Sequence, residues 1–239
     1  MLENQKIWVV IPAAGVGKRM GLDTPKQYLL LNDEPVLKHT IDIFDKHDAI
    51  SEIIVSVSKK DEYWSELSFN LSKPLHRVAG GTERCDSVLN GLIYLQSKAS
   101  QDDWVLVHDA ARPCLRHDDL TLLIDTLSEH EVGGLLAVPV RDTIKKSFSD
   151  TTTVETTVDR SNLWHALTPQ MFRFGVLFDA LVTALGKKEI VTDDASAIEL
   201  AGYKPRLVEG HADNLKITRP EDLALAAFYL RDHLSNKQE

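Results

Sequence analysis

A glycine-rich segment with two basic side chains directly follows the first apolar run of the chain. The segment covers residues 12–21 (PAAGVGKRMG), and the apolar run covers residues 7–11. Small residues let the backbone approach a ligand closely, and successive N–H groups of such a loop can surround phosphate oxygens. The segment matches neither GxGxxG nor the P-loop pattern GxxxxGK[ST]. It therefore favours an anion site without either familiar motif, although a tight turn with solvated basic residues would explain it as well.

Two cations near this loop could hold a polyphosphate. Arg19 and Lys26 are seven residues apart with Pro25 between them, so both can turn back toward the end of the first strand. Arg offers paired hydrogen bonds to phosphate oxygens, whereas Lys supplies a compact charge. A triphosphate needs several such partners, and Arg19 and Lys26 are candidates for two of them.

Two further segments have residue types suited to ligand binding. Gly80 and Gly81 precede a helical stretch that has Ser87 at its entrance, which permits close backbone approach but also describes an ordinary capped turn. Asp109 follows the apolar run 104–107, where an acidic residue suits Mg²⁺ because this ion takes one or two carboxylates plus phosphate oxygens and waters. A loop-capping role for Asp109 stays open.

The elements that must position these residues alternate between strand and helix patterns. Strands are expected at 7–11, 53–57, 104–107 and 134–140, and helices after Pro35, at 87–95, 120–127, 176–185 and 194–200, and from Arg219 onward. Thr192 is the expected N-cap of the helix at 194–200. This order predicts an α/β fold, Rossmann-like, with a mostly parallel sheet flanked by helices in a single domain over residues 1–239. The polar, Thr-rich stretch 141–159 breaks the pattern and predicts a projecting β-hairpin arm.

Composition excludes several classes of protein. The 239 residues have a net charge of −9, which argues against a nucleic-acid partner. No apolar run approaches the roughly 20 residues that span a bilayer, so we expect no membrane association. The opening lacks a secretory signal pattern, and the two cysteines, Cys85 and Cys114, suggest no disulfide framework. A cytoplasmic protein is expected.

The motifs together resemble a known family of nucleotidyltransferases. From Ile11 to about Tyr229 the chain contains PAAGxGxRM, PKQYL, GGxxRxxSV, VLVHDAARP, PVRDT, TVDR, LWxALTPQ, TDDASAxE, DNxKIT and RPEDLxLA. These resemble 2-C-methyl-D-erythritol 4-phosphate cytidylyltransferases of the non-mevalonate isoprenoid pathway. The resemblance implies a nucleotidyltransferase fold and transfer of CMP from CTP to methylerythritol phosphate. The substrate phosphate would attack the α-phosphorus in line, and pyrophosphate would leave, with Mg²⁺ as the cofactor.

The resemblance also implies roles for individual residues and a homodimer joined through the 141–159 arm. CTP would be bound by Pro12, Ala13, Ala14, Gly15, Gly81 and Ser87. The catalytic residues would be Arg19, Lys26, Lys216 and Arg160. The second substrate would be bound by Asp109, Ala110, Arg112 and Thr168, and by Thr143 and Arg160 from the partner's arm, with Asp109 also considered for the metal. Thr82 departs from the family, which has an acidic residue there, so the contact with the base is open at this position.

Three alternatives remain at this point. A ribitol 5-phosphate cytidylyltransferase would have the same fold and differ only where the second substrate is recognised. A non-catalytic nucleotide-binding protein is a second alternative, against which the presence of Arg19, Lys26, Asp109 and Lys216 argues. A dinucleotide-binding enzyme is disfavoured because GxGxxG is missing.

Overall fold

The centre of the molecule is a seven-stranded mixed sheet. The computed structural model describes residues 5–15 and 24–235. In sheet order the strands are β11 (Arg206–Glu209), β7 (Gly133–Pro139), β10 (Trp164–Arg173), β6 (Trp104–Val107), β1 (Ile7–Ala13), β4 (Ile50–Val57) and β5 (Leu75–Ala79). Among these described strands, β10 alone runs against its neighbours, β6 and β7. The sequence-based prediction of a mostly parallel α/β sheet is confirmed.

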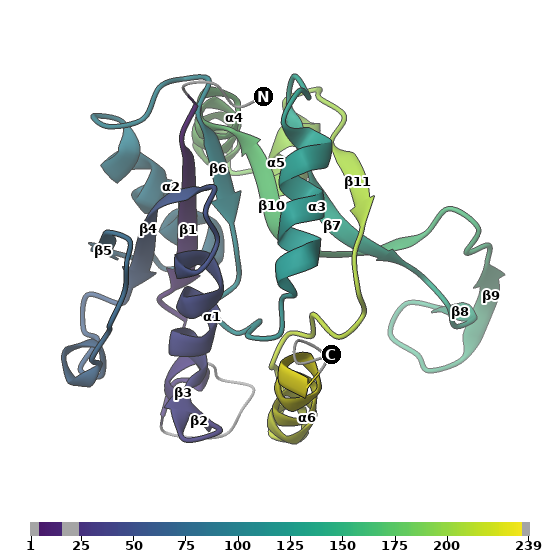
Figure 1. Ribbon diagram of the computed structural model, residues 1–239. Coiled ribbons are helices and arrows are strands. Elements are labelled where there is room, and N and C mark those ends of the chain that lie inside the picture. The colour runs from purple at the N-terminus through teal and green to yellow at the C-terminus, as the bar shows by residue number, and fades with distance from the viewer. Residues whose placement is uncertain (1–4, 16–23, 236–239) are drawn as a thin grey trace.

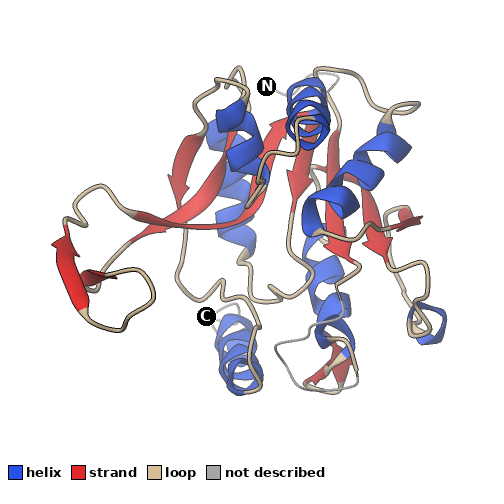
Figure 2. Cartoon of the chain, turned by 180° about the vertical axis from the view of Figure 1, so that it is seen from behind, coloured by secondary structure: helices blue, strands red, loops and turns tan. Residues whose placement is uncertain are grey.

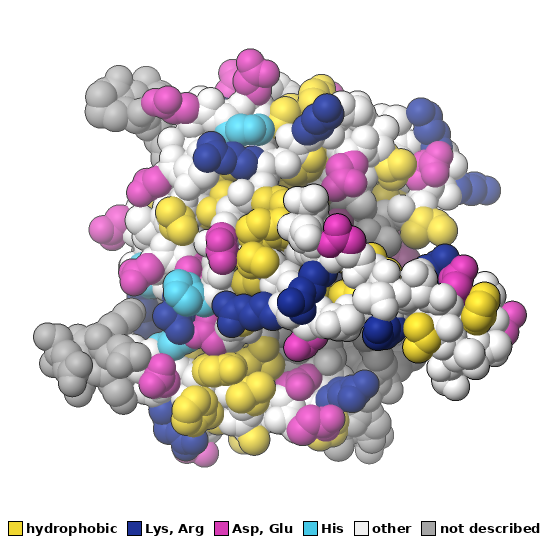
Figure 3. All heavy atoms as spheres, turned by 90° about the vertical axis from the view of Figure 1, so that its right-hand side faces the viewer, with side chains coloured by type: hydrophobic (Ala, Val, Ile, Leu, Met, Phe, Trp, Pro, Cys, Tyr) yellow, Lys and Arg dark blue, Asp and Glu magenta, His cyan; other side chains and the backbone are white. Residues whose placement is uncertain are grey.

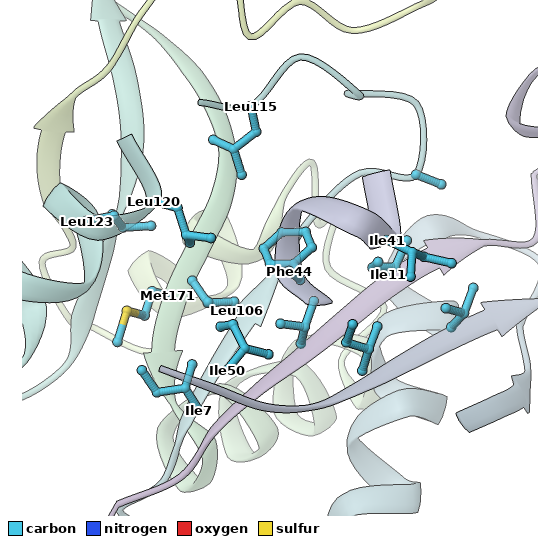
Figure 4. Close-up of a cluster of buried hydrophobic side chains, with 14 of the residues drawn as sticks. Ile7, Ile11, Ile41, Phe44, Ile50, Leu106, Leu115, Leu120, Leu123 and Met171 are labelled. Atoms are coloured by element: carbon cyan, nitrogen blue, oxygen red, sulfur yellow. The ribbon is translucent and has the colours of Figure 1, made fainter. Parts of the chain in front are cut away.

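Strand β1 shows why this sheet is covered on both faces. Ile7 and Ile11 belong to one buried cluster, whereas Trp8 and Val10 belong to another. Side chains alternate between the faces of a strand, so an unbroken apolar run needs an apolar layer on each side. Figure 4 shows the first of these clusters, in which Ile7 lies near Ile50 and Ile11 lies near Ile41.

Helices form the two covering layers (Figures 1 and 2). One face is covered by α1 (Val36–Asp45) and α3 (His117–Leu127). The other is covered by α2 (Arg84–Leu95), α4 (Phe174–Gly186) and α5 (Asp194–Leu200). Each helix has a buried apolar stripe at helical spacing, such as Leu37, Ile41 and Phe44 on α1. None of the helices within the described ranges is long and apolar enough to cross a membrane.

A smaller third cluster lies below the carboxyl ends of the parallel strands. Helix α6 (Glu221–Ser235) packs there through Ala226, against Leu31 and Ile217. Strands β2 (Leu30–Leu31) and β3 (Glu34–Pro35) form a tight hairpin beside it. Two short 3₁₀ helices, η2 (Lys26–Tyr28) and η3 (Trp64–Glu66), lie in connecting segments.

The Thr-rich stretch forms a projecting hairpin, as its sequence predicts. Strand β8 (Ile144–Ser147) pairs antiparallel with β9 (Val154–Val158), and the pair stands away from the body of the molecule (Figure 1). We call residues 141–159 the arm. Its side chains are mostly exposed, which suits a Thr-rich segment with few apolar residues to bury. Whether it joins two subunits stays a prediction.

Several boundaries differ from the sequence-based expectation. Helix α5 is capped by Asp193, whose carboxylate accepts a hydrogen bond from the Ser196 N–H at 2.9 Å, so the prediction of Thr192 as the N-cap is wrong. Helix α2 begins at Arg84, one turn before the expected start, because its first residues are polar and show no apolar period. Strand β10 was not predicted, because we assigned no strand or helix to residues 160–169 from the sequence.

Candidate functional site

The loops that leave β1 and β6 enclose a pocket of 440 Å³ at the carboxyl edge of the sheet. Ligands of open α/β sheets bind at this edge. The pocket is lined by Pro12, Ala13, Ala14, Gly15, Lys26, Gln27, Gly81, Thr82, Glu83, Arg84, Ser87, Asp109, Ala110, Ala111, Lys216 and Thr218. Most of the residues predicted from sequence therefore meet in one place, although they come from distant parts of the chain.

A more open hollow of 810 Å³ lies elsewhere, around Arg173 and Asp179. It contains none of the sequence-predicted site residues. Its Arg173 is already engaged, since Nη1 donates to Gln5 Oε1 at 2.9 Å and the guanidinium lies 3.7 Å from the centre of the Trp104 ring. We therefore assign the chemistry to the smaller pocket.

Gln27 ties the glycine-rich loop to the turn that contains Lys26. Its buried Nε2 donates to the Ala13 carbonyl at 2.8 Å and to the Gly15 carbonyl at 3.2 Å. These two hydrogen bonds fix the course of the loop where residues 12–15 line the pocket. Gln27 was not among the predicted site residues. Residues 16–23, including the predicted catalytic Arg19, lie outside the described residues.

The second glycine segment has little room for side chains. A Cβ atom on Gly80 would collide with Ala14, and one on Gly81 would collide with Asp86. The Gly81 N–H donates to Ser87 Oγ at 3.0 Å. Gly80 thus allows this backbone to lie against the first loop, and Gly81 allows it to lie against the start of α2, where Ser87 fixes its course.

Asp109 lies between three cations. Its Oδ1 accepts from Arg84 Nε at 2.7 Å, and its Oδ2 lies 2.7 Å from Lys216 Nζ and 3.7 Å from Arg112 Nε. Burial would raise the pKa of Asp109, but Arg84, Lys216 and Arg112 outweigh burial and hold that pKa well below its usual range. Asp109 is therefore ionised in the folded protein and serves as an anchor for the cations around it.

Arg84 is a pocket residue that the sequence reading did not single out. It bridges two carboxylates, since Nη2 donates to Asp194 Oδ2 at 2.9 Å while Nε holds Asp109. Burial would lower the pKa of Arg84, but Asp194 and Asp109 outweigh burial and raise it above its usual value. Burial raises the pKa of Asp194, and Arg84 opposes that rise. The Arg in GGxxR, one turn from Ser87 on α2, was the available signal.

Thr168 lies behind Asp109 and does not line the pocket. Its Oγ1 accepts from the Asp109 N–H at 3.1 Å and lies 3.1 Å from His108 Nδ1. His108 Nε2 lies 3.0 Å from the Arg112 carbonyl, which only accepts, so Nε2 has the proton and Nδ1 accepts from Thr168. Burial lowers the pKa of His108 to about 4, which keeps the ring neutral. Thr168 thus holds the loop of Asp109 in this structure.

Lys216 is delivered by the segment between β11 and α6. In this segment Asn214 Nδ2 donates to the Thr168 carbonyl at 2.7 Å, and the Asn214 carbonyl accepts from Arg112 Nη1 at 2.6 Å. Lys26 Nζ donates to the Ile217 carbonyl at 3.1 Å. Two lysines from opposite ends of the chain therefore share one wall. Arg112 is buried behind that wall and does not line the pocket.

Thr143 and Arg160 are separate from this group. Thr143 is on the arm and Arg160 at its base, both are exposed, and neither lines the pocket of its own chain. The Arg160 guanidinium donates to the Arg141 carbonyl across the root of the arm. Their predicted contact with a partner's pocket stays a prediction.

Comparison with known proteins identifies the family. The family model described as IspD, 2-C-methyl-D-erythritol 4-phosphate cytidylyltransferase, matches residues 7–232. A protein of that name from Vibrio vulnificus (strain YJ016) is 52% identical over 221 residues, which cover 92% of this chain and 93% of the relative. One from Pseudomonas entomophila (strain L48) is 54% identical over 217 residues, with coverages of 90% and 92%.

Solved structures agree with these sequence matches. The crystal structure of the Francisella tularensis protein of the same name has a TM-score of 0.81 and 35% identity, and the match covers 94% of this chain and 100% of that one. Both the motifs and the fold extend over nearly the whole length of each protein. The chain therefore belongs to the 2-C-methyl-D-erythritol 4-phosphate cytidylyltransferase family.

Proposed function

We infer that this chain transfers CMP from CTP to 2-C-methyl-D-erythritol 4-phosphate, giving 4-diphosphocytidyl-2-C-methyl-D-erythritol and pyrophosphate. One observation carries the assignment of the site. The two glycine segments, Lys26, Lys216 and Asp109 meet in one pocket at the carboxyl edge of the sheet. Membership of the family supports the reaction.

The nucleotide is proposed to lie along the two glycine segments. Close backbone approach at Gly15 and Gly81 suits a flat base and ribose, and Ser87 closes the end of that pocket. The phosphates would lie toward Lys26 and Lys216, the cations that share the opposite wall. Thr82 and Glu83 also line the pocket, so either side chain is available to the base.

The chemistry proposed is a single displacement. An oxygen of the acceptor's phosphate monoester attacks the α-phosphorus of CTP, a new P–O bond forms, and the bond to the pyrophosphate oxygen breaks. The attacking oxygen is already ionised, so no general base is needed. The protein must hold two anions in line and stabilise charge on the transferred phosphoryl group, which is the work of Lys26 and Lys216.

Mg²⁺ is proposed as the cofactor, and it would neutralise charge on the triphosphate. The described pocket does not fit a directly bound ion at Asp109, because both oxygens of that carboxylate are engaged by Arg84 and Lys216. Another cation placed there would be repelled by both. We propose that Mg²⁺ binds through the phosphates of CTP. Asp109 as a metal ligand remains a prediction against which these ion pairs argue.

We propose that a partner subunit completes the binding site of the second substrate. Arg160 and Thr143 lie outside the pocket of their own chain, at the root of an arm that stands away from the body. Phe148 and Val154 on the arm are each 52% exposed, and Figure 3 shows hydrophobic side chains gathered on this side of the molecule. A homodimer in which each arm reaches the other pocket would cover such groups and bring Arg160 to the acceptor phosphate.

A cytoplasmic location is also proposed. Both cysteines are free, Cys85 half-buried and Cys114 buried, which suits a reducing compartment.

The test is pyrophosphate release with Mg²⁺ and CTP, with methylerythritol 4-phosphate and ribitol 5-phosphate offered in parallel. Release with the first acceptor alone is expected. Release with ribitol 5-phosphate alone would keep the mechanism but replace the acceptor. No release with either, together with measurable CTP binding, would favour a nucleotide-binding protein without this activity.

A further inference from the structure

Asp194 is a carboxyl residue whose side chain is closed off from solvent. Its side chain is fully buried at the start of α5, in the segment TDDAS. Oδ2 accepts from Arg84 Nη2 at 2.9 Å, whereas Oδ1 has no hydrogen-bond partner within the described part of the chain. Burying a carboxylate is costly unless it is paired. Arg84 is therefore the group that makes this buried charge tolerable.

Arg84 in turn has its orientation set from two sides. Its Nε points to Asp109 and its Nη2 points to Asp194, at 2.7 and 2.9 Å. The guanidinium is planar and rigid, so two partners on two of its nitrogens fix both its position and its plane. A single carboxylate would leave it free to rotate about that one contact.

Asp194 itself is held by the central sheet. Gln170, on β10, accepts from the Ala195 N–H through Oε1 at 2.7 Å and donates from Nε2 to Asp193 Oδ2 at 2.8 Å. Both contacts are at the first residues of α5 and flank Asp194. The start of the helix is thus fixed to a strand that pairs with β6, the strand that Asp109 follows.

We propose that Asp194 is a positioning residue for the transfer reaction, which acts by holding Arg84 against Asp109 and thereby sets Lys216. The contacts run from Gln170 to the start of α5, then from Asp194 through Arg84 to Asp109 Oδ1. The other oxygen of Asp109 holds Lys216 Nζ at 2.7 Å. Asp194 itself does not line the pocket. This role rests on the proposed function, because Lys216 matters only if phosphates bind beside it.

Loss of the charge on Asp194 has a defined consequence. Arg84 would be attracted to Asp109 alone, would rotate about that contact, and would compete with Lys216 for the carboxylate. A shift of about 1 Å in a group that positions a reacting phosphate can cost on the order of a hundredfold in rate. Substrate binding uses many other contacts in the pocket, so the substitution should lower kcat and change KM little.

The test is a double-mutant cycle with Asp194→Asn and Arg84→Lys. Asparagine at position 194 keeps the shape of the side chain and one hydrogen-bond acceptor oxygen but removes the negative charge. Lysine keeps the charge but cannot reach both carboxylates at once. Each single variant should lower kcat about tenfold, the scale of a partial loss of positioning, with KM for both substrates changed less than about threefold. The double variant should be no worse than the poorer single variant, because both changes break one bridge.

Additive losses in the double variant would overturn the proposal. An unchanged kcat in Arg84→Lys would overturn it as well. This variant alone tests the proposal if Asp194→Asn fails to fold. The matched control is Asp103→Asn, another buried carboxylate, which accepts hydrogen bonds from Trp8 Nε1 at 2.9 Å and from the Ser100 N–H at 3.0 Å and does not line the pocket. It should lose stability but keep kcat, and an equal loss of kcat in this control would contradict a positioning role.

Wild-type protein in the same assay separates this inference from the proposed function. If the wild type releases pyrophosphate and the variants release it equally fast, only the role of Asp194 is overturned. No release by the wild type removes the reaction on which the role depends.

Discussion

Asp109 and Lys216 come from opposite halves of the chain, and their side chains meet with Oδ2 and Nζ 2.7 Å apart in the pocket wall. Arg84 holds the other oxygen of the same carboxylate. One buried anion thus arranges two cations before any ligand arrives. Preorganised charge of this kind stabilises a transition state without reorganisation during the reaction.

Lys26 should be essential for turnover. Lys26→Ala removes a cation beside the predicted position of the triphosphate, and we expect kcat to fall by at least about a hundredfold, the scale of losing one such electrostatic contact. The same is expected of Arg19→Ala from the family resemblance. Lys46→Ala, a change at an exposed position on the surface, is the matched control and should leave kcat unaltered. Steady-state kinetics decide, and undiminished turnover in Lys26→Ala would contradict the site.

Thr168→Val should misplace Asp109 by removing the hydroxyl that accepts from its N–H. Valine has a similar shape but can neither accept from the Asp109 N–H nor donate to His108. We expect about 1–3 kcal/mol lower free energy of unfolding, the cost of leaving buried polar groups unpaired. A fall in kcat of about tenfold should accompany it. Thr183→Val, at an exposed position of α4, is the control for the substitution. Equal kinetics in both variants would show that the Thr168 hydroxyl does not support the site.

Acidification should destabilise the protein through His108. Its folded pKa is lowered to about 4 by burial, whereas an unfolded histidine titrates near about 6.5. Between these values the unfolded chain binds a proton that the folded protein does not. The free energy of unfolding should therefore fall as the pH drops through this window, by up to about 3 kcal/mol.

Urea unfolding at pH 7 and pH 5 measures this fall, and His108→Gln should reduce the difference between the two. The lowered pKa of Asp109 has a separate effect, because its contribution is present above the unfolded value of about 3.9 and is lost only at lower pH. A stability difference that is the same in His108→Gln and wild type would assign the pH dependence to other groups.

Arg160→Ala should mainly raise KM for the sugar phosphate. If the arm completes the partner's pocket, a mixture of Arg160→Ala and Lys26→Ala proteins forms hybrid dimers with one intact site. Random mixing then gives roughly a quarter of wild-type activity, since half the dimers are hybrid and one of their two sites is complete. The assay uses a sugar-phosphate concentration below the raised KM of Arg160→Ala, so that each variant alone is nearly inactive. No recovery on mixing would mean that the arm acts on its own subunit, and a selective rise in KM for CTP would mean that Arg160 is misassigned.

Chelation of Mg²⁺ should stop turnover, and added Mg²⁺ should restore it. Asp109→Asn should lower kcat because it releases Arg84 and Lys216. The Mg²⁺ concentration for half-maximal activity should change by less than about threefold if the ion binds through the phosphates. A large increase in that concentration would identify Asp109 as a direct ligand of the metal.

The sequence by itself determined the fold class and most of the pocket. The apolar run at β1 without polar alternation required two covering layers, and Pro35 marked the start of α1, because these signals depend on local periodicity and backbone chemistry. The glycine segments, Lys26 and Asp109 could be selected because their types and their place after a strand suit an anion site. The arm was predictable from a change in composition.

Only the tertiary structure decided which residues support that chemistry. Thr168 was expected to contact the substrate, but in this structure it holds the Asp109 backbone, and Arg112 lies behind the wall. Arg84 and Asp194 meet across a large separation in sequence. No local pattern encodes such a meeting, because the distance between two side chains from different strands and helices is set by the order of the strands and the packing of the layers.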